Sequence, residues 1–173
     1  RSRDPKSIVN ECKQLISDGY KEVTLLGQNV DSYLWYGGGP KKDFKKTDEK
    51  TKKNSINFAK LLEKVAINCP NLRIRFSTSN PQDMTLDVIQ TMSKYSNICK
   101  YIHLPVQSGS SRILKLMRRG YNREEYIKLI DNIKNIMPEC AISMDMISGF
   151  CTESEEDHQA TLSLMDYVKY EYG

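Results

Sequence analysis

The stretch Lys100-Tyr-Ile-His-Leu-Pro-Val-Gln-Ser-Gly-Ser-Ser-Arg-Ile-Leu-Lys-Leu-Met117 contains the unit from which the fold is built. Its first five residues form a short run that predicts a β-strand, and Pro105 terminates that strand. Small polar residues follow, and the apolar spacing from Ile113 to Met117 predicts a helix. The order strand, polar loop, helix is a βα unit, and such units form a parallel sheet when they repeat.

The same alternation continues on both sides of this stretch. Pro5 at the start of one helix and a possible capping box, Thr152-x-x-Glu155, at the start of another fit the usual helix-start signals. Helices are predicted from Pro5 to the Asp18-Gly19 stop and over residues 58–66, 81–92, 113–117, 126–137 and 155–168; strands are predicted over residues 22–26, 72–77, 100–104 and 140–147. Strict alternation predicts a parallel sheet buried on both faces.

Four parallel strands with long loops suit either an open doubly wound sheet or part of a barrel. The first strand is not followed by the glycine pattern GxGxxG, and a further strand is expected to begin at Tyr170 to Gly173. An incomplete barrel would leave sheet edges unpaired. We therefore predict an α/β fold, a partial (β/α) TIM-like barrel in which parallel strands alternate with helices, and we expect it to be a fragment of a longer chain.

The composition excludes several classes of protein. The 173 residues are 39% hydrophobic, and no run approaches the roughly 20 apolar residues of a membrane-spanning helix. The N-terminus, Arg1-Ser-Arg-Asp-Pro5, has no apolar core of a signal peptide. Five widely spaced cysteines fit reduced thiols better than a disulfide framework. These features predict a cytoplasmic globular protein with no membrane partner.

The net charge of +4 is concentrated in one segment. Lys41 to Lys53 holds seven lysines, opposed only by Asp43, Asp48 and Glu49, whereas the rest of the chain is neutral. The segment follows three glycines, so we interpret residues 35–55 as a Gly/Lys-rich insertion loop that is mobile and solvated. Contact with RNA remains an open alternative for this loop.

Polar and small residues follow every predicted strand. In barrels and in open parallel sheets, ligands bind at the carboxyl ends of the strands. Donors and acceptors gathered there suit a hydroxyl-rich, amine-bearing ligand, although such residues also cap helices and close turns. The segments are Gly27-Gln28-Asn29-Val30-Asp31, Ser77-Thr78-Ser79-Asn80-Pro81, Pro105-Val106-Gln107-Ser108-Gly109-Ser110, and Asp145 with Gly149-Phe150-Cys151-Thr152-Glu153.

Several strings in this order resemble the radical S-adenosylmethionine (SAM) core of the methylthiotransferases. Together they are more similar to the MiaB-type tRNA enzymes than to the branch that modifies a ribosomal protein. The strings are Leu25-Leu-Gly-Gln-Asn-Val30, Arg75-Phe-Ser-Thr-Ser-Asn-Pro81, His103-Leu-Pro-Val-Gln-Ser-Gly-Ser110, Leu114-Lys-Leu-Met-Arg-Arg-Gly-Tyr121, Met146-Ile-Ser-Gly-Phe150 and Glu155-Glu-Asp157.

The resemblance implies a partial barrel that works with SAM and two [4Fe-4S] clusters in the full-length enzyme. One cluster cleaves SAM to a 5′-deoxyadenosyl radical, and the product is 2-methylthio-N6-dimethylallyladenosine next to the tRNA anticodon. The tRNA is the implied partner; no obligate protein partner is inferred, and the intact enzyme is expected to be a monomer.

The resemblance also assigns residues to the cofactor. Gln107 and Asp145 fall where related enzymes hydrogen-bond the ribose, and the segment Gly27, Gln28 and Asn29 matches the one that receives the methionine amine. Arg119 falls where a cation meets the methionine carboxylate, and a guanidinium can grip a carboxylate through two hydrogen bonds. The alternative for Arg119 is a solvent-facing cation at a helix end.

The chain departs from the family in two places. Family members carry CxxxCxxC, whose three thiolates hold the cluster, and this motif is absent. We therefore take residues 1–173 as a partial radical SAM core without its cluster-binding and C-terminal RNA-binding domains. The fragment alone is expected to be inactive, with no bound cofactor and no metal ligands. Cys151-Thr152 also replaces the Pro-Gly of many relatives, which leaves the local turn uncertain.

Three alternatives remain open from the sequence. A methylthiotransferase of another branch would act on threonylcarbamoyladenosine in tRNA or on a ribosomal protein. A cluster-free module that binds RNA or nucleotides would use the same polar strand ends together with the lysines. A metal hydrolase is disfavoured because His103 and His158 are the only histidines and HExxH is absent; we interpret His103 as a structural residue.

Overall fold

The computed structural model describes residues 1–77 and 79–173, and in these ranges the predicted parallel strands form one curved sheet. β1 pairs in parallel with β4, and β5 pairs in parallel with β6. A parallel bridge between Ile74 and Ile98, just before β5, joins the two pairs. The four strands are β1 (Glu22–Leu25), β4 (Arg73–Phe76), β5 (Tyr101–His103) and β6 (Ala141–Ser143).

The chain end begins a further parallel strand beside β6. The Glu171 amide donates to the Ile142 carbonyl at 3.1 Å, and the Met144 amide donates to the Tyr172 carbonyl at 3.3 Å. A parallel bridge joins Ser143 to Tyr172. Residues 171–172 therefore pair in parallel with β6 at the place where a further strand is expected to begin.

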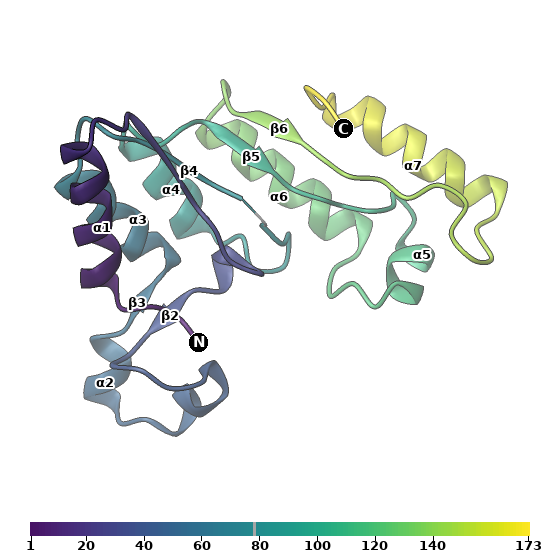
Figure 1. Cartoon of the computed structure of the whole chain (residues 1–173). Coiled ribbons are helices and arrows are strands. Elements are labelled where there is room, and N and C mark those ends of the chain that lie inside the picture. Colours follow the sequence, from purple (N-terminus) through teal and green to yellow (C-terminus); the bar gives the residue numbers. More distant parts are fainter. Residues whose placement is uncertain (78) are drawn as a thin grey trace.

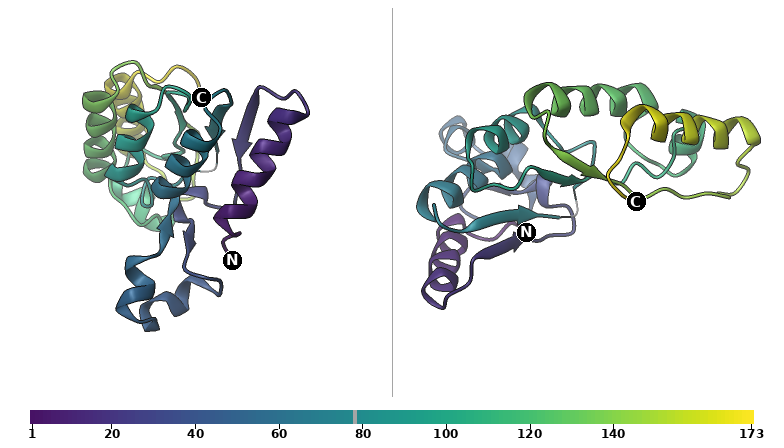
Figure 2. Two further views of the ribbon diagram at one scale, coloured as in Figure 1. Left: turned by 90° about the vertical axis from the view of Figure 1, so that its left-hand side faces the viewer. Right: turned by 90° about the horizontal axis from the view of Figure 1, so that it is seen from above.

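The strands form a curved inner layer, and the helices pack along its outer side (Figure 2). This arrangement is part of a βα barrel, as the alternation predicted. Within the described residues, no helix is long and apolar enough to cross a membrane. The helices of this layer are α1 (Pro5–Ser17), α3 (Phe58–Asn68), α4 (Leu86–Lys94), α6 (Arg123–Ile136) and α7 (Glu155–Val168), and the short α5 (Ser111–Leu116) precedes α6 (Figure 1).

The sheet is buried on only one face, so the prediction of burial on both faces is wrong. Side chains alternate along each strand, and Ile74, Ile102 and Ile142 point to the helices and are at most 1% exposed. The intervening residues, such as Arg75 and Tyr101, are half-buried on the inner side. The described chain places no helix over that side, so polar side chains occupy it.

One helix start and one helix cap differ from the sequence prediction. The α4 helix begins at Leu86 rather than Pro81, because the Asn80 carbonyl accepts from the Asp83 and Met84 amides in a separate turn. The N-cap of α7 is Ser154 rather than Thr152, and Ser154 forms a capping box with Asp157. The remaining helices lie close to their predicted ranges, and Asp4 caps α1 by accepting from the Ser7 amide.

The Gly/Lys-rich segment contains secondary structure and projects from the sheet (Figure 1). A short 3-10 helix, η1 (Val30–Ser32), precedes it. Its base is an antiparallel pair of short strands, and the Tyr36 and Phe44 rings pack with centroids 5.3 Å apart. Its elements are β2 (Leu34–Trp35), a second 3-10 helix η2 (Lys41–Lys46), α2 (Glu49–Lys53) and β3 (Ile56–Asn57).

Candidate functional site at the carboxyl edge of the strands

Gln107 and Asp145 are neighbours at the carboxyl ends of β5 and β6. The backbone amide of Gln107 donates to the backbone carbonyl of Asp145 at 2.9 Å, and the backbone amide of Ile147 donates to the backbone carbonyl of Gln107 at 2.8 Å. The Asp145 side chain is 62% exposed, and Gln107 is half-buried. Gln107 has a φ of +73°, in a region that non-glycine residues rarely adopt. The backbone thus fixes both residues side by side at this edge.

His103 connects Asp145 to the interior of the sheet. The His103 Nδ1 lies 2.8 Å from the Ser143 hydroxyl, and its Nε2 lies 3.4 Å from Asp145 Oδ2. Because Ser143 holds one ring nitrogen, the other is directed at the carboxylate. The sequence predicts a structural role for His103, and its contact with Ser143 fits that role; its second ring nitrogen also faces Asp145.

Polar contacts continue across the inner face from β6 to β1. Ser143 and Tyr101 share a hydroxyl contact of 2.8 Å, and the Arg75 guanidinium lies over the Tyr101 ring at 5.9 Å. Arg75 also forms an ion pair with Glu22 of β1 at 3.1 Å. This continuous set of contacts holds the inner sides of the strands in register below the carboxyl edge.

Gly27, Gln28 and Asn29 line a cavity of about 610 Å³ between β1, α1 and the first residues of the chain. This volume is in the range of small-molecule sites. The Asn29 amide nitrogen donates to Asp83 at 2.5 Å. Its Oδ1 is buried and has no hydrogen-bond partner among the described residues. A buried acceptor of this kind is costly unless a ligand or water donates to it.

Asp31 ties the end of β1 to the end of β4. It is 7% exposed and accepts from the Ser79 hydroxyl at 3.4 Å and from the Asn80 amide at 3.2 Å. Burial raises the pKa of Asp31 to about 6, although both donors act in the opposite direction. Asp31 is the last residue of the strand-end segment Gly27-Gln28-Asn29-Val30-Asp31, and this position was the only sequence signal for its role.

The six predicted cofactor-binding residues lie in a group of three, a pair and one separate position. Gly27 to Asn29 share the cavity, and Gln107 and Asp145 share a backbone ladder. Arg119 follows α5, where its amide donates to the Leu114 carbonyl at 2.9 Å. No hydrogen bond or ion pair joins the Arg119 side chain to the other five across residues 1–77 and 79–173. Thr78, part of the predicted segment after the second strand, lies outside the described residues.

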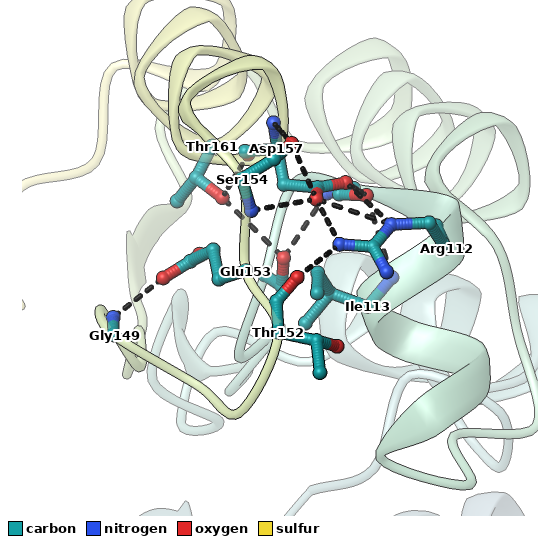
Figure 3. A network of polar contacts seen from close by, with 10 residues as sticks. Arg112, Ile113, Gly149, Thr152, Glu153, Ser154, Asp157 and Thr161 are labelled. Carbon is teal, nitrogen blue, oxygen red and sulfur yellow. Dashed lines mark hydrogen bonds and ion pairs between the residues drawn. The ribbon is translucent and has the colours of Figure 1, made fainter.

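A polar network fixes α7 against the loop that follows β5 (Figure 3). Asp157, in the first turn of α7, forms an ion pair with Arg112 and accepts from the Ser110 hydroxyl at 2.5 Å. The Ser154 amide donates to the same carboxylate at 3.0 Å. The pKa of Asp157 is strongly lowered, because Arg112 first and then Ser110 stabilise the ionised form. No local pattern in the sequence predicts the Arg112–Asp157 pair, because its members lie 45 positions apart.

Gly109 is required by packing against α7. A Cβ at Gly109 would lie 2.4 Å from the Ala160 carbonyl oxygen and 2.5 Å from the Thr161 Cα. The Gly109 amide donates to Thr161 Oγ1 at 2.9 Å, and Ser108 is fully buried beside it. Ser108, Gly109 and Ser110 therefore attach the loop to the fold, which holds Gln107 in place.

The turn at Cys151-Thr152 keeps a backbone shape that favours glycine. Thr152 has a φ of +68°, and its carbonyl accepts from the Arg112 guanidinium at 2.5 Å. A non-glycine residue in this region is strained by about 1–2 kcal/mol. The turn questioned on sequence grounds is thus formed with strain at Thr152.

The cysteines of this chain do not fit an iron–sulfur cluster. Burial raises the pKa of Cys12 to about 11 and that of Cys140 to about 12, so both are protonated thiols at neutral pH. Cys69 is fully buried in the core, whereas Cys151 is exposed. Over residues 1–77 and 79–173, no group of three or more histidine, cysteine or acidic residues is placed to hold a metal ion.

Relatives with high sequence identity cover the whole chain. It is 68% identical over 173 residues to the tRNA-2-methylthio-N(6)-dimethylallyladenosine synthase of Christiangramia forsetii, spanning 36% of that protein. It is 62% identical to the synthase of the same name from Flavobacterium johnsoniae, over 100% of this chain and 36% of that protein. The Bacteroides thetaiotaomicron synthase is 49% identical over 99% of the chain, which spans 35% of it. The chain thus spans about a third of these relatives, and they confirm the resemblance to the methylthiotransferases.

Two comparisons address the fold and the family. A solved structure of the cobalamin-dependent S-adenosylmethionine radical enzyme OxsB with aqua-cobalamin bound has a TM-score of 0.65 and 10% identity, covering 94% of this chain and 22% of that one. This likeness confirms the partial barrel and, at such low identity, shows the fold alone. The family model described as Radical SAM superfamily matches residues 1–165. With nearly the whole chain matched, the protein belongs to the radical SAM superfamily.

Proposed function

We propose that this chain is part of the core of a tRNA methylthiotransferase that converts N6-dimethylallyladenosine, next to the anticodon, into its 2-methylthio derivative. The observation that carries the proposal is the 68% identity, over every residue of this chain, to a protein named for that synthesis. The chain represents about a third of that relative, so the activity is proposed for the longer protein. We assign the reaction to the cytoplasm and to a monomeric enzyme.

The carboxyl edge of the strands has groups that fit SAM. Asn29 lines the cavity and its buried Oδ1 lacks a partner within the described residues, so we assign this oxygen to accept a hydrogen bond from the methionine ammonium. Asp145 offers an exposed carboxylate on a rigid strand end, which can accept from both ribose hydroxyls. When bound, SAM and its cluster supply the 5′-deoxyadenosyl radical that the reaction requires.

The protein residues orient the cofactor rather than react with it. Ser143 and His103 are assigned to hold Asp145 for the ribose, and backbone hydrogen bonds place Gln107 directly beside Asp145. The Asp157 network keeps the loop carrying Gln107 against α7. Arg119 is proposed to receive the methionine carboxylate. Because the cysteines here do not fit a cluster, the thiolates that hold one are assigned to another part of the longer protein, and two clusters are proposed in total.

The test uses the full-length protein that contains this chain. It is reconstituted with iron and sulfide without oxygen, then incubated with a low-potential chemical reductant, SAM and tRNA that carries N6-dimethylallyladenosine. Mass spectrometry of the digested nucleosides is expected to show the 2-methylthio product. Asp145→Asn is expected to reduce product formation, whereas Asp18→Asn, at the opposite edge of the sheet, retains it. A fully reconstituted protein that leaves this tRNA unmodified contradicts the proposal.

Two further outcomes separate the alternatives from the sequence. A methylthio group on threonylcarbamoyladenosine, or on a ribosomal protein, would assign the protein to another branch. RNA binding by a full-length protein that takes up no cluster would support a cluster-free binding module. The names of the relatives favour the dimethylallyladenosine substrate.

A further inference from the structure

We propose that the Gly/Lys-rich insertion, residues 35–55, binds the sugar-phosphate backbone of the RNA substrate at the entrance to the candidate site. This inference rests on the proposed function, because it assumes that RNA approaches the carboxyl edge. It adds an RNA-contacting surface on the barrel part of the protein, besides the C-terminal RNA-binding domain that the family resemblance implies.

The insertion carries an excess of unpaired positive charge. Of its seven lysines, Lys41 lies 4.0 Å from Asp83, Lys46 lies 3.9 Å from Asp43, and Lys52 lies 2.8 Å from Glu49. The other four are exposed and form no ion pair among the described residues: Lys42, Lys45, Lys50 and Lys53. The chain outside the segment 41–53 is neutral, so the positive field of the protein is centred here.

Internal contacts hold these lysines on an ordered surface. The Tyr36 hydroxyl donates to the Pro40 carbonyl at 2.7 Å, and the Tyr36 ring packs on Phe44 of η2. Asp48 caps α2 by accepting from the Thr51 amide at 2.7 Å. The short strands β2 and β3 close the base of the segment. The lysines are thus carried by two short helices, which reduces the ordering cost of binding a polyanion.

The location of the insertion connects this charge to the site. It leaves the body of the protein after β1, at the carboxyl edge, and projects beyond the N-terminus (Figure 1). Lys41 lines the same cavity as Gly27, Gln28 and Asn29. A nucleotide entering that region would therefore place the adjoining phosphates near η2 and α2.

These features favour RNA over an acidic protein as the partner. A protein interface normally has an apolar centre, whereas exposed lysines and acidic residues dominate η2 and α2. Phosphate contacts need only positive side chains that follow a backbone. The insertion offers exposed positive side chains but no apolar centre, because its aromatic residues Tyr36 and Phe44 pack against each other inside the segment.

The size of the effect follows from counterion release. Each phosphate contact adds about 0.9 to the slope of log affinity against log salt for a duplex, and about 0.7 for a single strand. We take each of the four unpaired lysines to contact one phosphate. Removing all four then lowers the ratio of the affinity at about 50 mM salt to the affinity at about 200 mM salt by about 50- to 150-fold.

The experiment compares two variants of the full-length protein with equal loss of charge. The test variant replaces Lys42, Lys45, Lys50 and Lys53 with glutamine. The control replaces four exposed lysines on the outer helices with glutamine: Lys6, Lys13, Lys64 and Lys128. Binding of a fluorescent tRNA is measured over a salt series, and melting temperature and SAM affinity confirm that each variant is intact. The test variant is expected to lose affinity and salt slope, and the control to retain both.

Equal salt slopes in the two variants would overturn the inference, and so would wild-type protein that binds no tRNA. A test variant that binds tRNA normally but fails to accept electrons from an acidic redox protein would overturn it in favour of a protein partner. Failure of the proposed function is a separate result: the wild type would bind tRNA with the expected slope yet form no methylthio nucleoside.

Discussion

Replacing Gly109 with alanine is expected to force the loop between β5 and α5 away from α7. The added Cβ would lie 2.4 Å from the Ala160 carbonyl oxygen and 2.5 Å from the Thr161 Cα. Both contacts are to backbone, so no side-chain rotation relieves them. Overpacking of this kind costs about 1–3 kcal/mol, and loss of the Gly109–Thr161 hydrogen bond adds about 1 kcal/mol. We expect a total of about 3 kcal/mol, which lowers the melting temperature of a protein of this size by about 6–12 °C.

Gly120→Ala is the matched control. Its Cβ would lie 2.2 Å from the Gln82 Oε1, but this atom ends an exposed, flexible side chain that can rotate away. Both changes reduce the freedom of the unfolded chain equally, by about 0.4–1 kcal/mol. Thermal unfolding of the two variants therefore isolates the backbone clash. Melting temperatures within about 2 °C of each other would refute the packing argument.

Three other predictions concern stability. Thr152→Gly relieves the left-handed strain and is expected to raise stability by about 0.5–1 kcal/mol, seen as a melting temperature about 1–4 °C higher; no increase would contradict the strain. The Asp31 pKa of about 6 exceeds the ordinary value of 3.8, so this carboxyl holds its proton more tightly when folded and its contribution falls as pH rises from about 4 to 6. Relative to Asp31→Asn, the wild type is expected to lose about 3 kcal/mol of folding stability between about pH 4 and 6, measured by thermal melting at each pH. Melting temperatures of the two proteins that change in parallel with pH would exclude the raised pKa. The pKa of Asp157 is lowered, so its effect on stability has the opposite pH dependence. The ionised carboxylate stabilises the fold fully above the ordinary aspartate pKa, and this stabilisation is lost as pH falls below that value. The difference in melting temperature between wild type and Asp157→Asn should therefore stay constant from about pH 7 to 5 and shrink only in stronger acid.

Local sequence signals were sufficient for the order of the elements. Asp4 and Pro5 start α1 as expected, and the apolar spacing of α3 and α6 gives helices close to their predicted ranges. These signals act within one turn of the chain, so periodicity detects them. The parallel alternation then followed from topology rules, and the pairing of residues 171–172 with β6 agrees with it.

Signals that compete locally could not be resolved from sequence. Both Thr152-x-x-Glu155 and Ser154-x-x-Asp157 fit a capping box, and the structure uses the second because Asp157 also binds Arg112. The choice depends on a residue 45 positions away in the chain. Likewise, the sequence places Gly109 in a strand-end segment that suits a ligand, a helix cap or a turn, whereas the group that lies against Gly109 is the backbone of α7.

The candidate site was predictable in location but not in internal geometry. The rule that ligands meet the carboxyl ends of strands selected Gly27 to Asn29, Gln107 and Asp145 correctly as residues of that edge. Their contacts involve residues distant in the sequence: His103 of β5 faces Asp145, and Asp83, in the turn before α4, accepts a hydrogen bond from Asn29. Linear patterns do not contain these distances, and the cofactor-binding roles of all six residues, Arg119 included, remain predictions.

The affinity of the reconstituted full-length protein for SAM tests the account most directly. A hydrogen bond to a charged group contributes about 1.5–3 kcal/mol, so Asp145→Asn is expected to weaken SAM binding by about 10- to 150-fold. Asp18→Asn, at the opposite edge, should bind SAM as the wild type does. Unchanged affinity in Asp145→Asn, measured by equilibrium titration, would contradict the assignment of the cofactor to this edge of the barrel.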